Sequence, residues 1–168
     1  MSRIAVICGT GMSGLSNEFD VIKPNSTLRI ETNWGDVPVT LSQIKEGIVA
    51  VVDRHHSSGA LRKPPHNIEH RANVMAVKSL VPDIIVSVNS VGTMRKDMPP
   101  GTVGVTSDVL DLSTRPWTFF DEDATHFDRT SIFDDSCSKI CVRALIESQG
   151  YSPSCLLYTS PSPRDGQI

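Results

Sequence analysis

Short apolar runs alternate with polar turns along the first part of the chain. RIAVIC at residues 3–8 and GIVAVVD at residues 47–53 are apolar at nearly every position. Such runs are typical of strands that are buried on both faces of a sheet. TLRIE at 27–31 and VPVTLSQI at 37–44 are shorter or partly alternating. The pattern therefore predicts a strand at each of these four runs.

Helical spacing follows the paired prolines Pro64 and Pro65, whose missing N–H groups do no harm just before a helix. Apolar residues recur every three or four positions between His66 and Leu80, namely Ile68, Ala72, Met75, Ala76 and Leu80. This spacing predicts a helix over the same range.

Two further strands and a second helix are predicted in the rest of the chain. DIIVSVNSVG at 83–92 is expected to be another buried strand, and GTVGVTSDVLDL at 101–112 one more. A helix from about Asp134 to Ser148 would carry one apolar stripe, made of Ile140, Ala144 and Leu145. Strands that alternate with helices predict an α/β layered fold whose sheet is at least partly parallel.

The composition is that of an ordinary globular chain of 168 residues, 39% hydrophobic and 21% charged. A net charge of −3 argues against a general binder of nucleic acids or membrane surfaces, because those partners require a broad basic face. There is no apolar run of about 18 residues and no leader cleavage pattern, so a cytoplasmic location is expected. The four cysteines lack paired spacing. We therefore expect reduced thiols and no metal site.

A glycine-rich turn directly follows the first strand. CGTGMSG matches G-x-G-x-x-G at Gly9, Gly11 and Gly14, and Glu31 stands about where a dinucleotide fingerprint places its ribose-binding acid. The same turn can instead hold one free phosphate, because glycines let main-chain N–H groups approach an anion and the Thr10 hydroxyl adds a donor. It can also be a tight turn with no ligand. The turn alone leaves these alternatives open.

A cluster of basic residues follows the strand at 47–53. DRHHSSGALRKPPHNIEHR holds four of the five histidines in this acidic chain. Arg54 and His55 come at the carboxyl end of that strand, where open α/β sheets bind ligands, and a guanidinium can grip two phosphate oxygens. Asn89 and Ser90 add donors from a third strand end. Together with the glycine turn, these residues predict one tetrahedral anion held by three strand ends.

A simpler interpretation exists for each basic residue. Arg54 would then pair with Asp53 or another surface acid. We expect no more than this of His56, Arg62 and Lys63, which are interpreted as solvated or ion-paired loop residues.

Five blocks carry a family likeness: IAVICGTG, DRHH, PPHNIEHRANVMAVKSL, VNSVGTMRKDMPPG and STRPWTFFDE. In order and approximate spacing they resemble the S-methyl-5'-thioadenosine phosphorylase and purine nucleoside phosphorylase family, over about residues 3–147. The resemblance implies a phosphorylase-type layered α/β fold with a mixed, barrel-like central sheet flanked by helices. Residues 1–150 would be the N-terminal part of that domain.

The implied activity is phosphorolysis of a purine nucleoside (6-oxopurine nucleoside, methylthioinosine or methylthioadenosine) to the free purine base and ribose 1-phosphate or methylthioribose 1-phosphate. Inorganic phosphate is the co-substrate, and no cofactor is implied. The family works as a homotrimer or hexamer. The resemblance implies six phosphate-binding residues: Thr10, Gly11, Arg54, His55, Asn89 and Ser90.

Two further features follow from the resemblance. Asn89 followed by Ser90 is more similar to members that act on 6-oxopurine or methylthioinosine nucleosides than to methylthioadenosine phosphorylases. His126 lies near the position from which the family reaches into a neighbouring subunit's pocket, although a solvated loop histidine is an equal alternative. The motif at Thr118–Asp121 is expected to hold loop and interface packing.

The chain also departs from the family pattern. His56 stands where the family usually has glycine, Leu61 replaces a common histidine, and Glu69 and His70 replace an Asn-Tyr pair. We expect these changes to loosen the phosphate loop. The group that contacts the purine is expected downstream of this sequence, so the catalytic residue is unknown. A Rossmann-type NAD(P)-binding protein and a non-catalytic phosphorylase homologue stay open as alternatives.

The last segment, YSPSCLLYTSPSPRDGQI at 151–168, is rich in Pro, Ser and Thr and has no usable periodicity. Part of it, CLLYTSPSPRD, resembles the translated read-through of a transposase sequencing adapter. We therefore expect a tail outside the domain, of artefactual origin. An ordinary flexible tail is the alternative.

Overall fold

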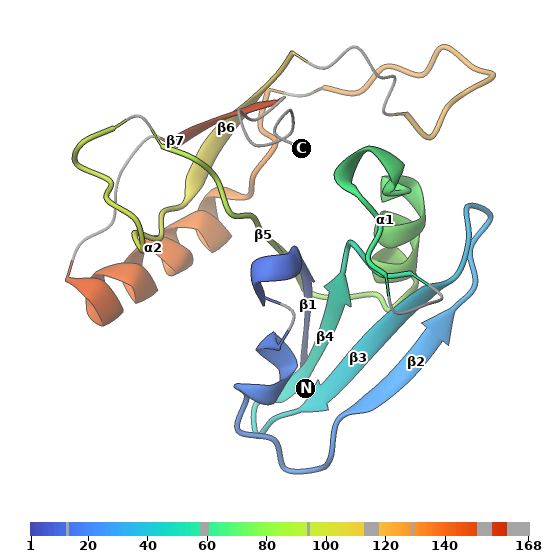
Figure 1. Cartoon of the computed structure of the whole chain (residues 1–168), viewed down its shortest axis with the longest axis horizontal. Coiled ribbons are helices and arrows are strands. Elements are labelled where there is room, and N and C mark those ends of the chain that lie inside the picture. The colour runs from blue at the N-terminus through green and yellow to red at the C-terminus, as the bar shows by residue number, and fades with distance from the viewer. Residues whose placement is uncertain are drawn as a thin grey trace. The chain divides into compact units, whose positions relative to one another are not determined.

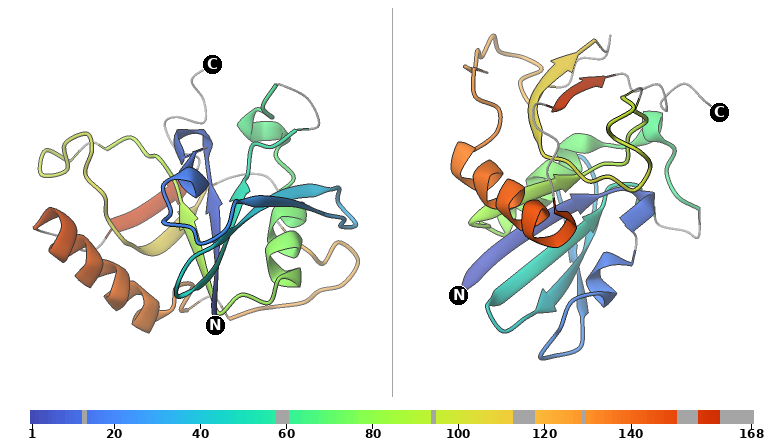
Figure 2. Two further views of the ribbon diagram at one scale, coloured as in Figure 1. Left: turned by 90° about the horizontal axis from the view of Figure 1, so that it is seen from below. Right: turned by 90° about the vertical axis from the view of Figure 1, so that its left-hand side faces the viewer.

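The computed structural model describes residues 1–12, 14–57, 61–93, 95–112, 118–128 and 130–150, and the backbone of residues 156–160. The chain divides into two compact units, Met1–Ser90 and Val91–Ile168. Figure 1 and Figure 2 show the elements of each unit.

A five-stranded mixed sheet forms the first unit (Figure 1), with the strand order β2-β3-β4-β1-β5. β1 pairs in parallel with β4 on one side and with β5 on the other. β3 pairs antiparallel with both β2 and β4. This arrangement confirms the predicted α/β class with a mixed sheet. The strands are β1 (Ser2–Cys8), β2 (Ser26–Ile30), β3 (Val37–Gln43), β4 (Gly47–Asp53) and β5 (Ile84–Val88).

β1 and β4 are covered on both faces, as their continuous apolar runs predict. On one face, the helix α1 (His70–Ser79) packs against β3 and β4 and completes a core with β1. On the other face, a second cluster of β1 and β4 residues packs against side chains from the short 3-10 turns η1 (Thr10–Met12) and η2 (Leu15–Asn17). Side chains alternate across a strand, so the same two strands supply both clusters.

α1 begins four residues later than its apolar spacing predicts. A short 3-10 turn, η3 (Pro65–Asn67), comes first. Glu69 then caps the helix, because its carboxylate accepts the N–H of Arg71 at 3.1 Å. The predicted apolar stripe is otherwise confirmed: Ile68, Ala72 and Ala76 are buried, and Met75 and Leu80 are half-buried.

The second unit holds β6 (Thr106–Asp111), α2 (Asp135–Gln149) and β7 (Leu156–Ser160). α2 starts after Asp134, whose side chain accepts the N–H of Cys137 at 2.7 Å, and ends at Gly150, whose φ of 81° suits glycine. The helix is confirmed, and the residues of its predicted apolar stripe are exposed or half-buried. Within Asp135–Gln149 no residue is buried, and Ile140 is 59% exposed. Periodicity defines a helix face without defining what covers it.

Two other expectations differ from the structure. β5 is not a buried strand but the edge of the sheet, and its Ile85 is 54% exposed. Residues 156–160, placed in the predicted tail, form β7, which pairs in parallel with β6. The rest of that tail, 151–155 and 161–168, lies outside the described residues, and its origin stays a prediction.

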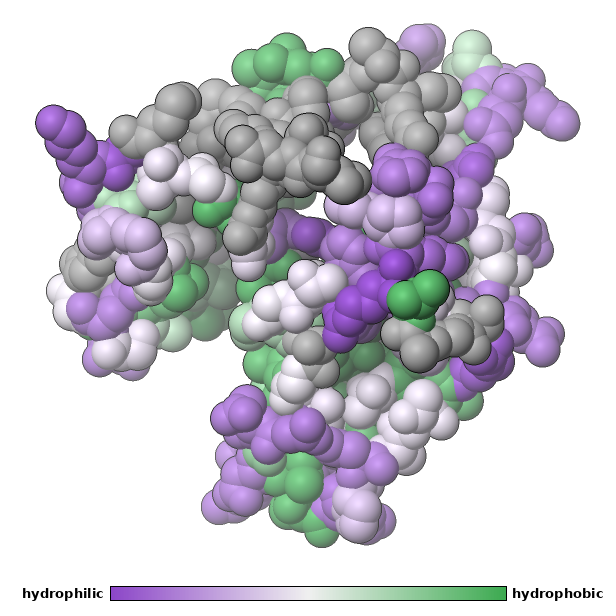
Figure 3. Space-filling view, in the orientation of Figure 1, coloured by the Kyte–Doolittle hydropathy of each residue, from purple (hydrophilic) through white to green (hydrophobic). Residues whose placement is uncertain are grey.

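Hydrophilic and hydrophobic residues are interspersed on the face of the molecule drawn in Figure 3. Among the residues that the structure describes, no helix combines the length and the apolar character that crossing a membrane requires.

Candidate active site

The candidate site lies at the carboxyl ends of three adjacent parallel strands, β4, β1 and β5. In the register of the sheet, Cys8 of β1 lies opposite both Asp53 of β4 and Val88 of β5. The residues that follow these positions therefore leave the sheet at the same edge. They are the glycine turn after β1, the Arg-His pair after β4, and the Asn-Ser pair after β5.

Arg54 has a neighbour at each nitrogen of its guanidinium. Its Nη1 donates to the side-chain oxygen of Asn89, and its Nε lies 3.4 Å from Nε2 of His55. A Cβ built on Gly9 would stand 3.0 Å from Nη2, so the third nitrogen lies against the glycine turn. Among the described residues no ion pair joins Arg54 to Asp53 or to another acid, and the Asp53 carboxylate binds Arg62 at 2.8 Å instead.

The glycine turn also meets the end of β5. A Cβ built on Gly11 would lie 3.3 Å from Oγ of Ser90, and the N–H of Met12 closes the turn on the carbonyl of Gly9 at 3.0 Å. Thr10 and Gly11 are exposed, as are Asn89 and Ser90. The structure thus brings together the three strand ends that the sequence assigns to one anion.

His55 is buried, with 8% of its surface exposed. Its Nδ1 lies 2.8 Å from the carbonyl oxygen of Lys63, which can only accept, so Nδ1 carries a hydrogen. The main chain of Lys63 donates back to the His55 carbonyl at 2.9 Å. Nε2 then carries the lone pair of the ring and accepts the N–H of Arg54 Nε at 3.4 Å, so His55 also holds the guanidinium in place.

His56 is not the solvated residue predicted from the sequence. It is half-buried, and its Nε2 lies 2.9 Å from Oδ1 of Asn73 on α1. Burial lowers the pKa of His56 below its ordinary value, because it disfavours the imidazolium. Two of the residues that depart from the family pattern thus have a local role, since His56 binds Asn73 and Glu69 caps α1, and Leu61 is 84% exposed. That these changes loosen the phosphate loop stays a prediction.

Asn73 is the residue at this site that the sequence argument missed. It is 2% exposed and lies on the core-facing side of α1, next to Ala72 and close to Ala76 and Val77. A polar residue on an apolar helix stripe is the signal that could have found it, because a buried amide requires hydrogen-bond partners.

Cys8 lies under the glycine turn as a buried thiol. Its Sγ is 3.6 Å from the carbonyl of Val52 and 3.7 Å from that of Met12. Burial raises the pKa of Cys8, and the nearby carboxylate of Asp53 adds to the effect, so the group stays a thiol. Cys137 and Cys141 are free and half-buried. Within the described ranges, no group of three or more His, Cys, Asp or Glu residues could hold a metal ion.

The second unit holds His126, which is exposed in the loop before α2. The adjacent Phe127 packs against Phe120, with ring centroids 5.3 Å apart. The N–H of Phe120 binds the hydroxyl of Thr118 at 2.9 Å. Residues 118–121 thus contribute to the packing of this loop, as the sequence predicts.

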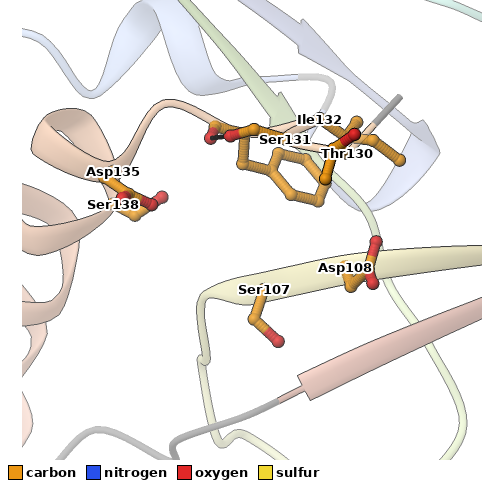
Figure 4. A pocket seen from close by; sticks show the side chains of 8 residues that line it. Ser107, Asp108, Thr130, Ser131, Ile132, Asp135 and Ser138 are labelled. Carbon is orange, nitrogen blue, oxygen red and sulfur yellow. Dashed lines mark hydrogen bonds between the residues drawn. The ribbon is translucent and has the colours of Figure 1, made fainter. Parts of the chain in front are cut away.

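A cavity of about 210 Å³ lies within the second unit, between β6, the loop at 130–133 and the start of α2 (Figure 4). Its lining is rich in hydroxyl and carboxylate groups and includes none of the predicted site residues. The lining residues are Ser107, Asp108, Thr130, Ser131, Ile132, Phe133, Asp135 and Ser138.

The dinucleotide alternative does not fit this topology. A Rossmann unit follows its glycine turn with a helix whose N-terminus faces the pyrophosphate. Here the glycine turn contains the 3-10 turn η1 and is followed by a second one, η2. Glu31 follows β2, which is separated from β1 by β3 and β4. The acid and the glycine turn therefore belong to strands that are not neighbours.

The fold and these groups define the class: an α/β protein that collects a guanidinium, an amide, a hydroxyl and a glycine turn at the carboxyl edge of its parallel strands. Comparison with known families agrees with the likeness described above. The chain belongs to the phosphorylase superfamily, whose sequence profile matches residues 3–160.

Similar proteins include two archaeal enzymes. The chain is 31% identical to S-methyl-5'-thioadenosine phosphorylase of Thermococcus kodakarensis, over 71% of this chain and 45% of that protein. It is 32% identical to 6-oxopurine nucleoside phosphorylase of Pyrococcus furiosus, over 75% of this chain and 46% of that protein. The chain thus spans about half the length of the curated relatives that it matches.

A solved structure supports the fold assignment. The crystal structure of a methylthioadenosine phosphorylase from an antarctic soil metagenomic library superposes with a TM-score of 0.76 and 26% identity. The match covers 94% of this chain and 55% of that one.

Proposed function

We propose that the whole protein catalyses phosphorolysis of purine nucleosides, and that this chain supplies the phosphate site. The observation that carries the proposal is the position of the Arg54 guanidinium, between Gly9 and Asn89 at one edge of the sheet. Ser90 lies against Gly11 at the same edge. A fixed positive group, neutral donors and an open glycine turn are what a phosphate ion requires.

In the proposed reaction, a phosphate oxygen attacks the anomeric carbon of the nucleoside. The bond from that carbon to the purine nitrogen breaks, and its electron pair leaves with the purine, which takes up a proton. The protein must hold phosphate in line with this bond and stabilise the departing base. Thr10, Gly11, Arg54, His55 and Ser90 perform the first task. Asn89 orients Arg54 and extends the site toward the sugar.

The substrate class follows from the relatives, which are named for methylthioadenosine and 6-oxopurine nucleosides. The Asn89-Ser90 pair favours a 6-oxopurine nucleoside or methylthioinosine. We assign the purine-contacting group to sequence beyond residue 150. His126 is proposed to enter the pocket of a neighbouring subunit in a cytoplasmic homotrimer or hexamer, with phosphate as co-substrate and no cofactor.

The test is an activity assay on the complete reading frame. Purine release from inosine, methylthioinosine and methylthioadenosine is measured with and without phosphate. We expect release from at least one of them, only when phosphate is present. Absence of release from all three removes the proposal. A protein that keeps its oligomer but binds no phosphate is then the non-catalytic homologue, whereas saturable NAD(P) binding that phosphate does not displace would restore the dinucleotide alternative.

A further inference from the structure

A buried amide links α1 to the Arg-His segment. Asn73 is 2% exposed, and both ends of its side chain have a partner in that segment. Nδ2 lies 3.4 Å from the carbonyl oxygen of Arg54, and Oδ1 lies 2.9 Å from Nε2 of His56. The two contacts fall on either side of His55. One side chain therefore holds the residue before His55 and the residue after it.

The carbonyl of Arg54 determines how the Asn73 amide is oriented and, through it, which nitrogen of the His56 ring carries a hydrogen. A carbonyl oxygen only accepts, so the end of the Asn73 amide that faces it is the NH₂ group. Oδ1 then faces His56, and since Oδ1 also only accepts, Nε2 of His56 carries a hydrogen. His56 is thus held with the hydrogen on Nε2. The His56 tautomer is therefore set by the contact between Asn73 and the Arg54 carbonyl, in which the His56 ring takes no part.

We propose that Asn73 and His56 form a positioning pair, which fixes the main chain of Arg54 and His55 so that the guanidinium faces the phosphate site. This proposal rests on the proposed function. The pair acts through Arg54 and touches no substrate. Its rigidity comes from α1, because the neighbouring Ala76 and Val77 are buried in the core against the sheet.

The opposite side of the segment is closed by different contacts. The main chains of Lys63 and His55 are joined at 2.9 Å, and Arg62 binds Asp53 at 2.8 Å. Asn73 and His56 supply the contacts on the α1 side. A glycine at position 56, as the family usually has, would have no side chain to make this bond. His56 is therefore a local addition that ties the segment to the helix.

The first test measures affinity for inorganic phosphate by isothermal titration calorimetry on the full chain. We expect Asn73→Ala and His56→Phe each to weaken binding about tenfold, the value of one hydrogen bond of about 1.4 kcal/mol. His56→Gln should restore affinity to within about twofold, because its amide can donate to Oδ1 of Asn73. The matched control is Val77→Ala, which removes buried volume from the same helix without touching the segment.

A purely structural role predicts that Val77→Ala weakens phosphate binding as much as Asn73→Ala, and that His56→Gln gives no rescue. Either result overturns the proposal. Unchanged phosphate affinity in Asn73→Ala also overturns it.

A second measurement does not depend on phosphate. Hydrogen exchange of the Lys63 amide, which donates to His55, reports how firmly the segment is held. We expect Asn73→Ala to speed this exchange about tenfold more than Val77→Ala does, and a nitrogen NMR spectrum of the His56 ring to lose its single tautomer. If the native protein binds no phosphate, the proposed function fails. Hydrogen exchange of the Lys63 amide still tests whether Asn73 and His56 position the segment. Equal exchange in the two variants refutes that role.

Discussion

Replacing Arg54 by lysine separates the charge at the candidate site from its geometry. The guanidinium uses separate nitrogens for Asn89, His55 and the space beside Gly9, whereas an ammonium is a point charge on a flexible stem. Arg54→Lys keeps the charge and loses this fixed fork. One hydrogen bond to a charged group contributes about 1.5–3 kcal/mol, so phosphate affinity should fall about 10- to 100-fold.

Calorimetric titration with inorganic phosphate checks this value, and thermal unfolding confirms that the variant is folded. Arg54→Met, which also removes the charge, should bind more weakly than Arg54→Lys. The matched control is Arg62→Lys, at an ion pair whose arginine side chain is 43% exposed, and its phosphate affinity should stay within about twofold of the native value. Native affinity in Arg54→Lys would refute the idea that guanidinium geometry holds the anion.

Two further predictions concern stability. The pKa of His56 is lowered from 6.5, and burial is the largest cause. The hydrogen bond to Asn73 and the charge of Asp53 oppose this shift, whereas the charges of Lys63 and Arg29 add to it. The unfolded chain therefore takes up this proton first as the pH falls, so the free energy of unfolding should decrease below about pH 6.5. Urea denaturation between pH 7.5 and 5.5 should show a shallower decrease in His56→Gln, and an unchanged slope would contradict the assignment. Separately, Val52→Ala deletes fully buried methyl groups of β4, so urea denaturation should show a loss of about 1.5–3 kcal/mol in the free energy of unfolding. The control Val74→Ala, at an exposed position, should lose less than about 0.5 kcal/mol, and equal losses would contradict the core assignment.

Local patterns predicted the elements closely. The expected strand at 47–53 is Gly47–Asp53 in the structure, and the helix expected at about 134–148 is Asp135–Gln149. These predictions succeed because backbone hydrogen bonding and side-chain periodicity are local properties of the chain. The start of α1 was missed because a carboxylate cap, at Glu69, decided it instead of the apolar spacing.

The sequence pattern predicted only part of which surfaces are covered: β1 and β4 are buried on both faces as expected, but two other elements are not. Four of the five residues of β5 (IIVSV) are apolar, yet β5 lies at the edge of the sheet with Ile85 exposed. Ile140 matches a helical stripe, yet it is also exposed. Burial depends on what a face packs against, and periodicity carries no information about the partner.

For the candidate site, the sequence alone determined the participants: a glycine turn, an Arg-His pair and an Asn-Ser pair, each placed after a strand. Only the tertiary structure decided that β4, β1 and β5 are parallel neighbours, and that their ends therefore meet at one edge. It also decided that Asn73 reaches across to Arg54 and His56. Strand order and contacts between distant segments are set by how the whole chain packs, since no local stretch contains both partners of such a contact.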